Sequence, residues 1–244
     1  MPHFLIDKNE IINSEFIELV ENENLFHLTK VLRVKKGEKI KFIDSDKNLF
    51  FCEVVDVLKN FLKAKIIKKE FSQRFLKFNL CLIQSILAPD AQNLLIANAV
   101  QTGVQEIYPV ISDNVSVSRK TLNDKVNKWN KIAQENFKQC ERADMPVVCE
   151  ISNLKDVLNN FKKENILIFA EKYENKTLNN CLLDIDLKEK IAVVVGPEGG
   201  FSQDEFEYFI KQEYKLISLG NLIYKAPNAV VAGISNIVSR IDNV

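Results

Sequence analysis

IAVVVGPEGGFSQDE, residues 191–205, is the stretch of sequence that decides the fold. Its first five residues are apolar and mostly β-branched, which predicts a fully buried strand. Ser202 and Glu205 have the spacing of a capping box, so a helix is expected to begin after Ser202. A tight turn therefore lies at the carboxyl end of a buried strand, and open α/β sheets bind their ligands at that edge.

The turn Gly196–Phe201 contains three of the chain's seven glycines. Such a density indicates either positive φ angles or a close approach of the backbone to something else. A ligand-binding loop and a glycine-rich turn required by geometry alone both fit this pattern. The turn is not a P-loop, because no Gly-Lys-Ser/Thr follows, and it lacks the G-x-G-x-x-G spacing of dinucleotide-binding folds.

A second glycine turn follows the predicted helix. Residues 215–220 form a short expected strand that ends in Gly220, and residues 221–229 lead into a final apolar helix over Val230–Val238. That helix is apolar nearly all round, so we expect it to be buried. Two successive strands that end in glycine turns predict a two-sided crevice at one edge of the sheet.

The rest of the chain divides into two patterns. Residues 38–70 form short expected strands around a turn at residues 44–47, which suits a small β-barrel. From residue 78 onward, strands alternate with helices, which predicts a parallel sheet covered on both faces. Expected strands cover residues 78–85, 107–111, 166–170 and 191–195, and expected helices cover 91–102, 120–142 and 154–163. A boundary is expected near Ser72–Arg74.

The net charge of zero hides an asymmetry. Between His27 and Lys77 there are fourteen Lys and Arg against six Asp and Glu, an excess of eight positive charges. A solvated sheet face would account for alternate lysines, but a concentrated excess favours a polyanion partner, such as a nucleic acid. The candidate residues for binding such a partner are Lys30, Arg33, Lys35 and Lys36.

Composition excludes several other classes. The chain has 244 residues, of which 46% are hydrophobic and 27% charged, as in ordinary globular proteins. No apolar window is long enough for a membrane span, and the first residues do not resemble a signal peptide, so we expect a cytoplasmic protein. Five scattered cysteines predict reduced thiols, and with only two histidines no metal site is expected.

Five motifs occur in the order found in one family, and together they span nearly the whole chain. They are His27-Leu28-x-x-Val31-Leu32-Arg33, Gly103-Val104-x-x-Ile107-x-Pro109, Trp129-x-x-Ile132-Ala133-x-Glu135-x-x-x-Gln139-x-x-Arg142, the loop at 196–201, and Leu219-Gly220. In these motifs the chain resembles the SPOUT superfamily, and within it the methyltransferases that act on N3 of a uridine in 16S ribosomal RNA.

The resemblance implies a fold and partners. It implies a PUA-like RNA-binding β-barrel over residues 1–72 and an α/β methyltransferase domain with a deep trefoil knot over residues 73–244. In the barrel, residues 27–33 would form a short helix with Val31 and Leu32 inward and Lys30 and Arg33 outward. It further implies S-adenosylmethionine as cofactor, 16S rRNA or the small ribosomal subunit as substrate, and a homodimer with its sites at the subunit interface.

The resemblance places the cofactor between the two glycine turns. Glycines at 196, 199 and 200 would let backbone amides approach it, and Leu219 with Gly220 would form the second wall. Such sites are mostly apolar with a few orienting hydrogen bonds. The candidate cofactor-binding residues are Ala170, Glu171, Gly196, Pro197, Glu198, Gly199, Gly200, Ile217, Leu219, Gly220, Leu222, Tyr224 and Ala229.

The candidate catalytic residues are Arg142, Glu198 and Lys225. Methylation of uracil N3 requires loss of a proton, so Glu198 is either a base or a residue that holds the loop by accepting backbone amides. Arg142 would stabilise the uracil anion or bind phosphate, unless it is an exposed, ion-paired arginine. The target base must leave its stack to be reached.

This chain departs from the family pattern at several charged positions. Lys225, Pro227 and Asn228 stand where the family carries an arginine, a glutamate and a threonine, and Asn98 and Asn114 replace a lysine and an arginine. Lys225 keeps the charge but loses the planar fork of arginine. Two alternatives therefore stay open beside the N3 reaction: methylation of another RNA position or a ribose hydroxyl, and RNA binding without catalysis.

Overall fold

The structure is a computed structural model that describes residues 3–115, 122, 124–170 and 178–241. The chain forms two compact units, one of Met1–Phe75 with Phe137–Met145 and one of Leu76–Asn136 with Pro146–Val244. A nine-residue segment from the second half of the chain therefore packs with the N-terminal residues 1–75.

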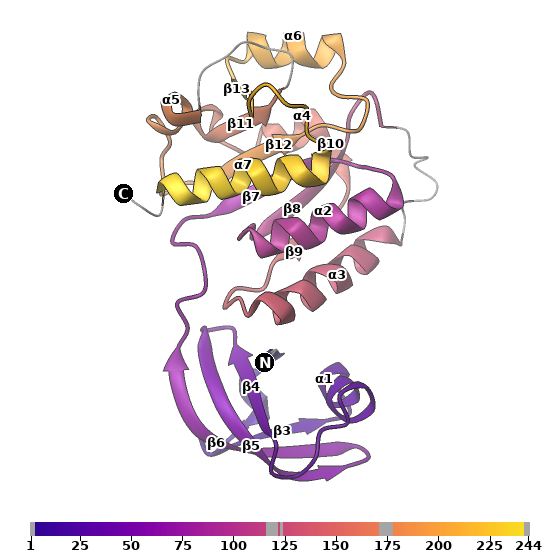
Figure 1. Ribbon diagram of the computed structural model, residues 1–244, viewed down its shortest axis with the longest axis vertical. Coiled ribbons are helices and arrows are strands. Elements are labelled where there is room, and N and C mark those ends of the chain that lie inside the picture. Colours follow the sequence, from indigo (N-terminus) through magenta and orange to yellow (C-terminus); the bar gives the residue numbers. More distant parts are fainter. Residues whose placement is uncertain (1–2, 116–121, 123, 171–177, 242–244) are drawn as a thin grey trace. The chain divides into compact units, whose positions relative to one another are not determined.

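The first unit is built on a six-stranded curved sheet (Figure 1). Its strands are β1 (His3–Ile6), β2 (Ile11–Ile12), β3 (Phe16–Val20), β4 (Lys39–Asp44), β5 (Asn48–Leu58) and β6 (Phe61–Phe71), in the order β1-β4-β5-β6-β3-β2. Among the described strands of this sheet, β1 and β4 pair in parallel and the other neighbours pair antiparallel. The predicted turn is confirmed, since Lys47 N donates to Asp44 O at 3.0 Å.

The expected start and orientation of the short helix over residues 27–33 were wrong. The helical stretch begins earlier than expected, with α1 (Glu23–Phe26) capped by Asn22, and continues as a π-helix over His27–Val31. Leu25 and Leu28 face the core of the unit, whereas Val31 and Leu32 are exposed. The wider π turn changes which residues share a face, so the inward face expected for an ordinary α-helix does not apply.

The second unit contains a sheet of seven parallel strands. The strands are β7 (Leu80–Ser85), β8 (Glu106–Ile111), β9 (Val147–Val148), β10 (Ser152–Asn153), β11 (Ile166–Phe169), β12 (Ile191–Val195) and β13 (Lys215–Ile217). The order is β10-β8-β7-β12-β11-β13, with β9 paired to β8. The α/β class predicted from the alternation of strands and helices is confirmed, and β12 occupies a central place in the sheet.

Helices cover both faces of this sheet. They are α2 (Pro89–Gln101), α3 (Lys125–Cys140), which continues into the first unit, α4 (Leu154–Leu158), α5 (Leu178–Leu182), α6 (Gln203–Lys211) and α7 (Ala226–Ile241). Apolar residues of α4 and α6 share one core with inward residues of β7, β11 and β12. Helices α2 and α7 lie side by side on the other face (Figure 1).

Several predicted bounds needed correction. The helix expected over 154–163 ends at Leu158 and is followed by a 3₁₀ turn at Lys163–Asn165, and the final helix begins at Ala226 rather than Val230. Gly103 ends α2 with a φ of +99°, as its C-cap role requires. Among the described residues, no helix is long and apolar enough to cross a membrane. All five cysteines are free thiols, as expected.

His3 gives the first unit a testable pH dependence. Its ring is buried and meets Phe137 edge-on at 4.8 Å between centroids. Desolvation, with the charges of Lys41 and Arg74, lowers its pKa from 6.5 to about 4, although Glu141 and a backbone hydrogen bond at Arg142 oppose this shift. Between these pH values the unfolded chain binds a proton that the folded chain does not, so stability falls as pH drops.

We expect the free energy of unfolding to fall between pH 6.5 and 4 by up to roughly 3 kcal/mol from this group. His3→Phe keeps a ring against Phe137 and removes the titration. Urea unfolding of both proteins at several pH values in this window measures the difference. Equal pH dependence in the two proteins would show that His3 titrates normally.

Candidate active site

The two glycine turns enclose a pocket of about 1070 Å³ in the second unit. It lies at the carboxyl ends of β11, β12 and β13 and is closed by the first residues of α2 and α7. This edge is where parallel sheets bind ligands. The lining residues are Leu87, Asp90, Ala91, Leu94, Phe169, Ala170, Val195–Phe201, Phe206, Ile217–Gly220 and Leu222–Ala229.

The first wall of the pocket is the loop after β12. Gly200 has a φ of +72°, and its amide donates to Pro197 O at 2.9 Å, which closes a tight turn. A Cβ atom on Gly196 would lie 3.2 Å from the ring of Phe201. That ring packs edge-on against Phe209 at 5.0 Å between centroids. The aromatic contact anchors the loop, so its glycines serve both backbone geometry and close packing.

The predicted capping box after this loop is confirmed. Ser202 Oγ accepts from Glu205 N at 3.1 Å, and Ser202 N donates to Glu205 Oε2 at 2.8 Å. The second oxygen of Glu205 accepts from Asp113 N at 3.0 Å, just beyond β8. Burial raises the pKa of Glu205, while these amide hydrogen bonds oppose that shift. One carboxylate thus ties the start of α6 to a second loop at the same edge.

Glu198 connects the loop to the start of α2. Its Oε1 accepts from Ala88 N at 2.9 Å, and Ala88, which precedes α2, has no side chain that could cap the helix. Gln92 adds a second contact, because its Oε1 accepts from Leu87 N at 2.9 Å. A backbone-amide hydrogen bond of the kind considered for a structural role of Glu198 is therefore present, and the choice between this role and that of a base stays a prediction. No sequence motif pointed to Gln92.

The second wall is formed by the turn after β13 and the start of α7. Gly220 has a φ of +111°, and its amide donates to Ser218 Oγ at 3.2 Å. Asn98 Nδ2 on α2 donates to Pro227 O at 3.0 Å and so fixes the first turn of α7. Asn98 therefore helps to hold this wall of the pocket.

Helix α7 approaches the ring of Phe169 unusually closely at Gly233. A Cβ atom there would lie only 2.1 Å from Cζ of Phe169, the residue at the end of β11 that lines the pocket. Carbon atoms in contact are normally 3.5–4.0 Å apart. Only glycine allows Phe169 to keep this position.

Nearly all predicted cofactor residues line this pocket, and so does Lys225. The exception is Glu171, which lies outside the described residues. Sequence reasoning missed the contribution of α2, because a helix start without glycine carries no motif. The additional lining residues include Leu87, Asp90, Leu94, Phe169 and Phe206.

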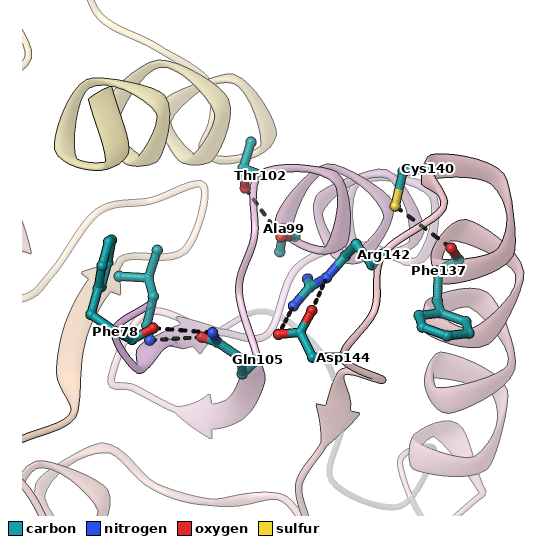
Figure 2. A network of polar contacts seen from close by, with 9 residues as sticks. Phe78, Ala99, Thr102, Gln105, Phe137, Cys140, Arg142 and Asp144 are labelled. Atoms are coloured by element: carbon teal, nitrogen blue, oxygen red, sulfur yellow. Dashed lines mark hydrogen bonds and ion pairs between the residues drawn. The ribbon is translucent and has the colours of Figure 1, made fainter. Parts of the chain in front are cut away.

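Arg142 lies in the first unit, in the turn after α3. It is buried, and its Nε and Nη2 bind the two oxygens of Asp144 at 3.0 and 2.8 Å (Figure 2). It is therefore not an exposed arginine. Any contact of this guanidinium with a substrate would have to compete with, or add to, a bidentate ion pair. In contrast, all four predicted RNA-binding cations at positions 30, 33, 35 and 36 are exposed.

Comparison with known families decides the relationship. A profile of the RNA methyltransferase domain matches residues 75–238, and a profile of the RNA methyltransferase PUA domain matches residues 20–67. This chain belongs to the RNA methyltransferase family. The two matches fall in the two parts of the chain that the sequence predicted to differ in architecture. The RNA methyltransferase therefore combines a PUA module with a methyltransferase domain.

The relatives match this RNA methyltransferase over more than nine tenths of its length. Ribosomal RNA small subunit methyltransferase E from Rickettsia conorii is 27% identical, covering 91% of this chain and 88% of its own. The Buchnera aphidicola protein of that name (subspecies Acyrthosiphon pisum) is 27% identical, covering 96% and 92%. A crystal structure of the Neisseria gonorrhoeae enzyme of that name, bound to S-adenosyl methionine, is 25% identical, covers 98% of both chains and superposes with a TM-score of 0.85.

Proposed function

We propose that this RNA methyltransferase transfers a methyl group from S-adenosylmethionine to N3 of a uridine in 16S ribosomal RNA. The observation that carries the proposal is the pocket between the two glycine turns, in a chain similar over its whole length to small-subunit methyltransferases. One of these relatives, with a TM-score of 0.85 to this structure, was crystallised with S-adenosyl methionine.

The pocket has the properties that this cofactor needs. Most of its lining is apolar, and the loop leaves open space beside Gly200, since nothing lies within 4 Å of a Cβ atom there. We assign the adenine to Ile217, Leu222 and Ala229, with the turns at Gly199–Gly200 and Leu219–Gly220 on either side. When bound, the cofactor supplies a methyl group on a cationic sulfur.

The protein's part in the reaction is mainly alignment. Holding the acceptor nitrogen in line with the methyl group removes much of the entropic barrier. Lys225 lines the pocket as a cation and is assigned to stabilise the uracil anion left when N3 loses its proton. Arg142 is assigned to contact the RNA substrate, since it belongs to the unit that carries the PUA module.

Asp90 extends the proposed cofactor site. It lines the pocket at the first turn of α2, and no ion pair to it occurs within the described part of the chain. The methionine portion of the cofactor carries an ammonium group, which this carboxylate is placed to attract. Asp90→Asn should weaken S-adenosylmethionine binding roughly 2- to 5-fold. Calorimetry measures the affinity of the variant for S-adenosylmethionine. Methylthioadenosine, which lacks the ammonium group, is the control ligand, and its affinity should not change.

We also propose that the enzyme acts in the cytoplasm as a homodimer. Leu222 and Ile223 line the pocket yet are largely exposed, and Leu94 on α2 and Val231 on α7 are exposed as well. Apolar side chains concentrated beside a binding site favour a protein contact there. A second copy of the chain would cover them and complete the pocket. Sedimentation of the purified protein measures whether it is a dimer.

The decisive experiment is mass spectrometry of nucleosides from 16S rRNA of cells that lack this protein. We expect 3-methyluridine to disappear and to return when the wild-type gene is restored, but not with Lys225→Met. Persistence of 3-methyluridine would refute the proposed product. Loss of a different methylated nucleoside instead would assign the enzyme to another RNA position.

A further inference from the structure

The helical stretch of the first unit presents two contrasting sides. Leu25 and Leu28 are buried in the core of the unit, and Asn24 Nδ2 donates to Leu5 O at 2.6 Å. His27 meets Phe4 edge-on at 5.5 Å between centroids. These contacts hold the stretch firmly on the curved sheet, so its other side keeps a defined shape.

The outward side carries large apolar groups. Phe26 is 63% exposed, Val31 58% and Leu32 46%. The family pattern places Val31 and Leu32 in a signature motif, yet neither is used in the core. Three exposed apolar side chains within seven residues of one short stretch are costly in water, and such groupings mark binding surfaces.

The backbone of this stretch is also unusual. Leu32 N donates to His27 O at 3.0 Å, five residues back, and Val34 N donates to Leu28 O at 3.0 Å. Arg33, between them, has a φ of +56°. π-helical turns are rare and frequent at functional sites, and a non-glycine residue in the left-handed region is uncommon. Val34 packs against the core of the unit, while Arg33, Lys35 and Lys36 around it are exposed.

Charge identifies the partner. Residues 26–36 include Lys30, Arg33, Lys35 and Lys36, all exposed, and no acidic residue. A symmetric contact between two copies of the chain would bring this surface against itself, and four positive charges would repel four others. A phosphate backbone is instead attracted by all four, and unpaired bases stack on exposed aromatic rings.

We propose that Phe26 is a stacking platform for an unpaired base of the RNA substrate, flanked by a cationic track of Lys30, Arg33, Lys35 and Lys36. Val31 and Leu32 contact the sugar and base edges beside it. This inference rests on the proposed action on RNA and specifies how the first unit holds the RNA. It predicts a preference for single-stranded over duplex RNA, since paired bases present no free face.

The test is the affinity of the full-length protein for a fluorescein-labelled oligouridine. Phe26→Ala should weaken binding roughly 5- to 100-fold without changing the salt dependence. Phe26→Leu should weaken it similarly, because an aliphatic group of comparable size cannot stack, whereas Phe26→Trp should bind normally and show fluorescence quenching. Each of Lys30→Gln, Lys35→Gln and Lys36→Gln should instead lower the salt slope by about 0.7.

Phe71→Ala is the matched control. Phe71 is 53% exposed in the same unit but lies at the end of β6, outside the cationic stretch, and its removal should not change affinity. Equal affinity of Phe26→Leu and wild type, or equal losses from Phe26→Ala and Phe71→Ala, would overturn the proposal. So would a shift of Phe26→Ala to monomer in sedimentation with RNA affinity intact, because that result assigns Phe26 to a protein contact.

The proposal and the proposed function fail separately. If Phe26→Ala loses oligouridine affinity as expected but the wild-type protein forms no 3-methyluridine, the stacking surface is supported and the proposed reaction is refuted. Formation of 3-methyluridine with unchanged oligouridine affinity in Phe26→Ala would do the reverse. S-adenosylmethionine affinity, measured by calorimetry, should be the same in all these variants.

Discussion

Gly233→Ala should lower the affinity for S-adenosylmethionine by roughly tenfold or more and destabilise the protein by about 1–3 kcal/mol. The added methyl group would lie 2.1 Å from the ring of Phe169, which β11 holds at the pocket wall. The ring is almost fully buried, so its open side is the pocket itself. A displaced Phe169 would therefore occupy cofactor space.

The expected loss is notable because alanine is the better helix former. In an exposed helix position the same change would stabilise by about 1 kcal/mol. Calorimetric titration with S-adenosylmethionine and thermal unfolding measure the two effects. Gly233→Ala combined with Phe169→Leu should recover part of both, since the smaller side chain leaves room. A fully stable Gly233→Ala variant with normal affinity would show that α7 does not need this close approach.

Glu198→Gln should keep S-adenosylmethionine affinity and most of kcat, whereas Glu198→Ala should lose roughly tenfold in affinity. Glu198 accepts a hydrogen bond from Ala88 N at 2.9 Å, and the glutamine carbonyl can accept the same bond. Alanine cannot, so the start of α2 would lose its tie to the loop. Leu87, Asp90 and Leu94, which line the pocket from this region, would then be less well placed.

The two variants separate a structural role from catalysis by a base. A general base at position 198 predicts that Glu198→Gln loses roughly 100-fold or more in kcat at unchanged cofactor affinity. Single-turnover methyl transfer, together with calorimetry, distinguishes these outcomes. Glu207→Gln, on the exposed side of α6, is the control for the loss of one negative charge near this loop.

Short-range features were predicted well. The strand at 191–195, the capping box at Ser202 and Glu205, and the C-cap at Gly103 all match the structure. Each depends on residues within a few positions of one another, because burial pattern, helix capping and left-handed turns are properties of short segments. The pocket loop was recognised for the same reason.

The orientation of the helical stretch at residues 23–31 was not predictable in this way. The resemblance implied a short helix over residues 27–33 with Val31 and Leu32 inward, but the chain forms a π-helical turn over His27–Val31. The difference rotates Val31 and Leu32 from the core to the surface. What stabilises this turn is the packing of Leu25 and Leu28 in a core formed by strands distant in the sequence.

By itself, the sequence determined the α/β class, the basic N-terminal module and the glycine turns that line the pocket, because local backbone geometry and periodicity encode them. The trefoil knot implied by the resemblance stays a prediction. Only the tertiary structure decided that the start of α2 completes the pocket through Glu198, that Gly233 makes room for Phe169, and that Arg142 packs with the N-terminal half. These contacts join residues more than 60 positions apart, and no local rule specifies which distant surfaces bury one another.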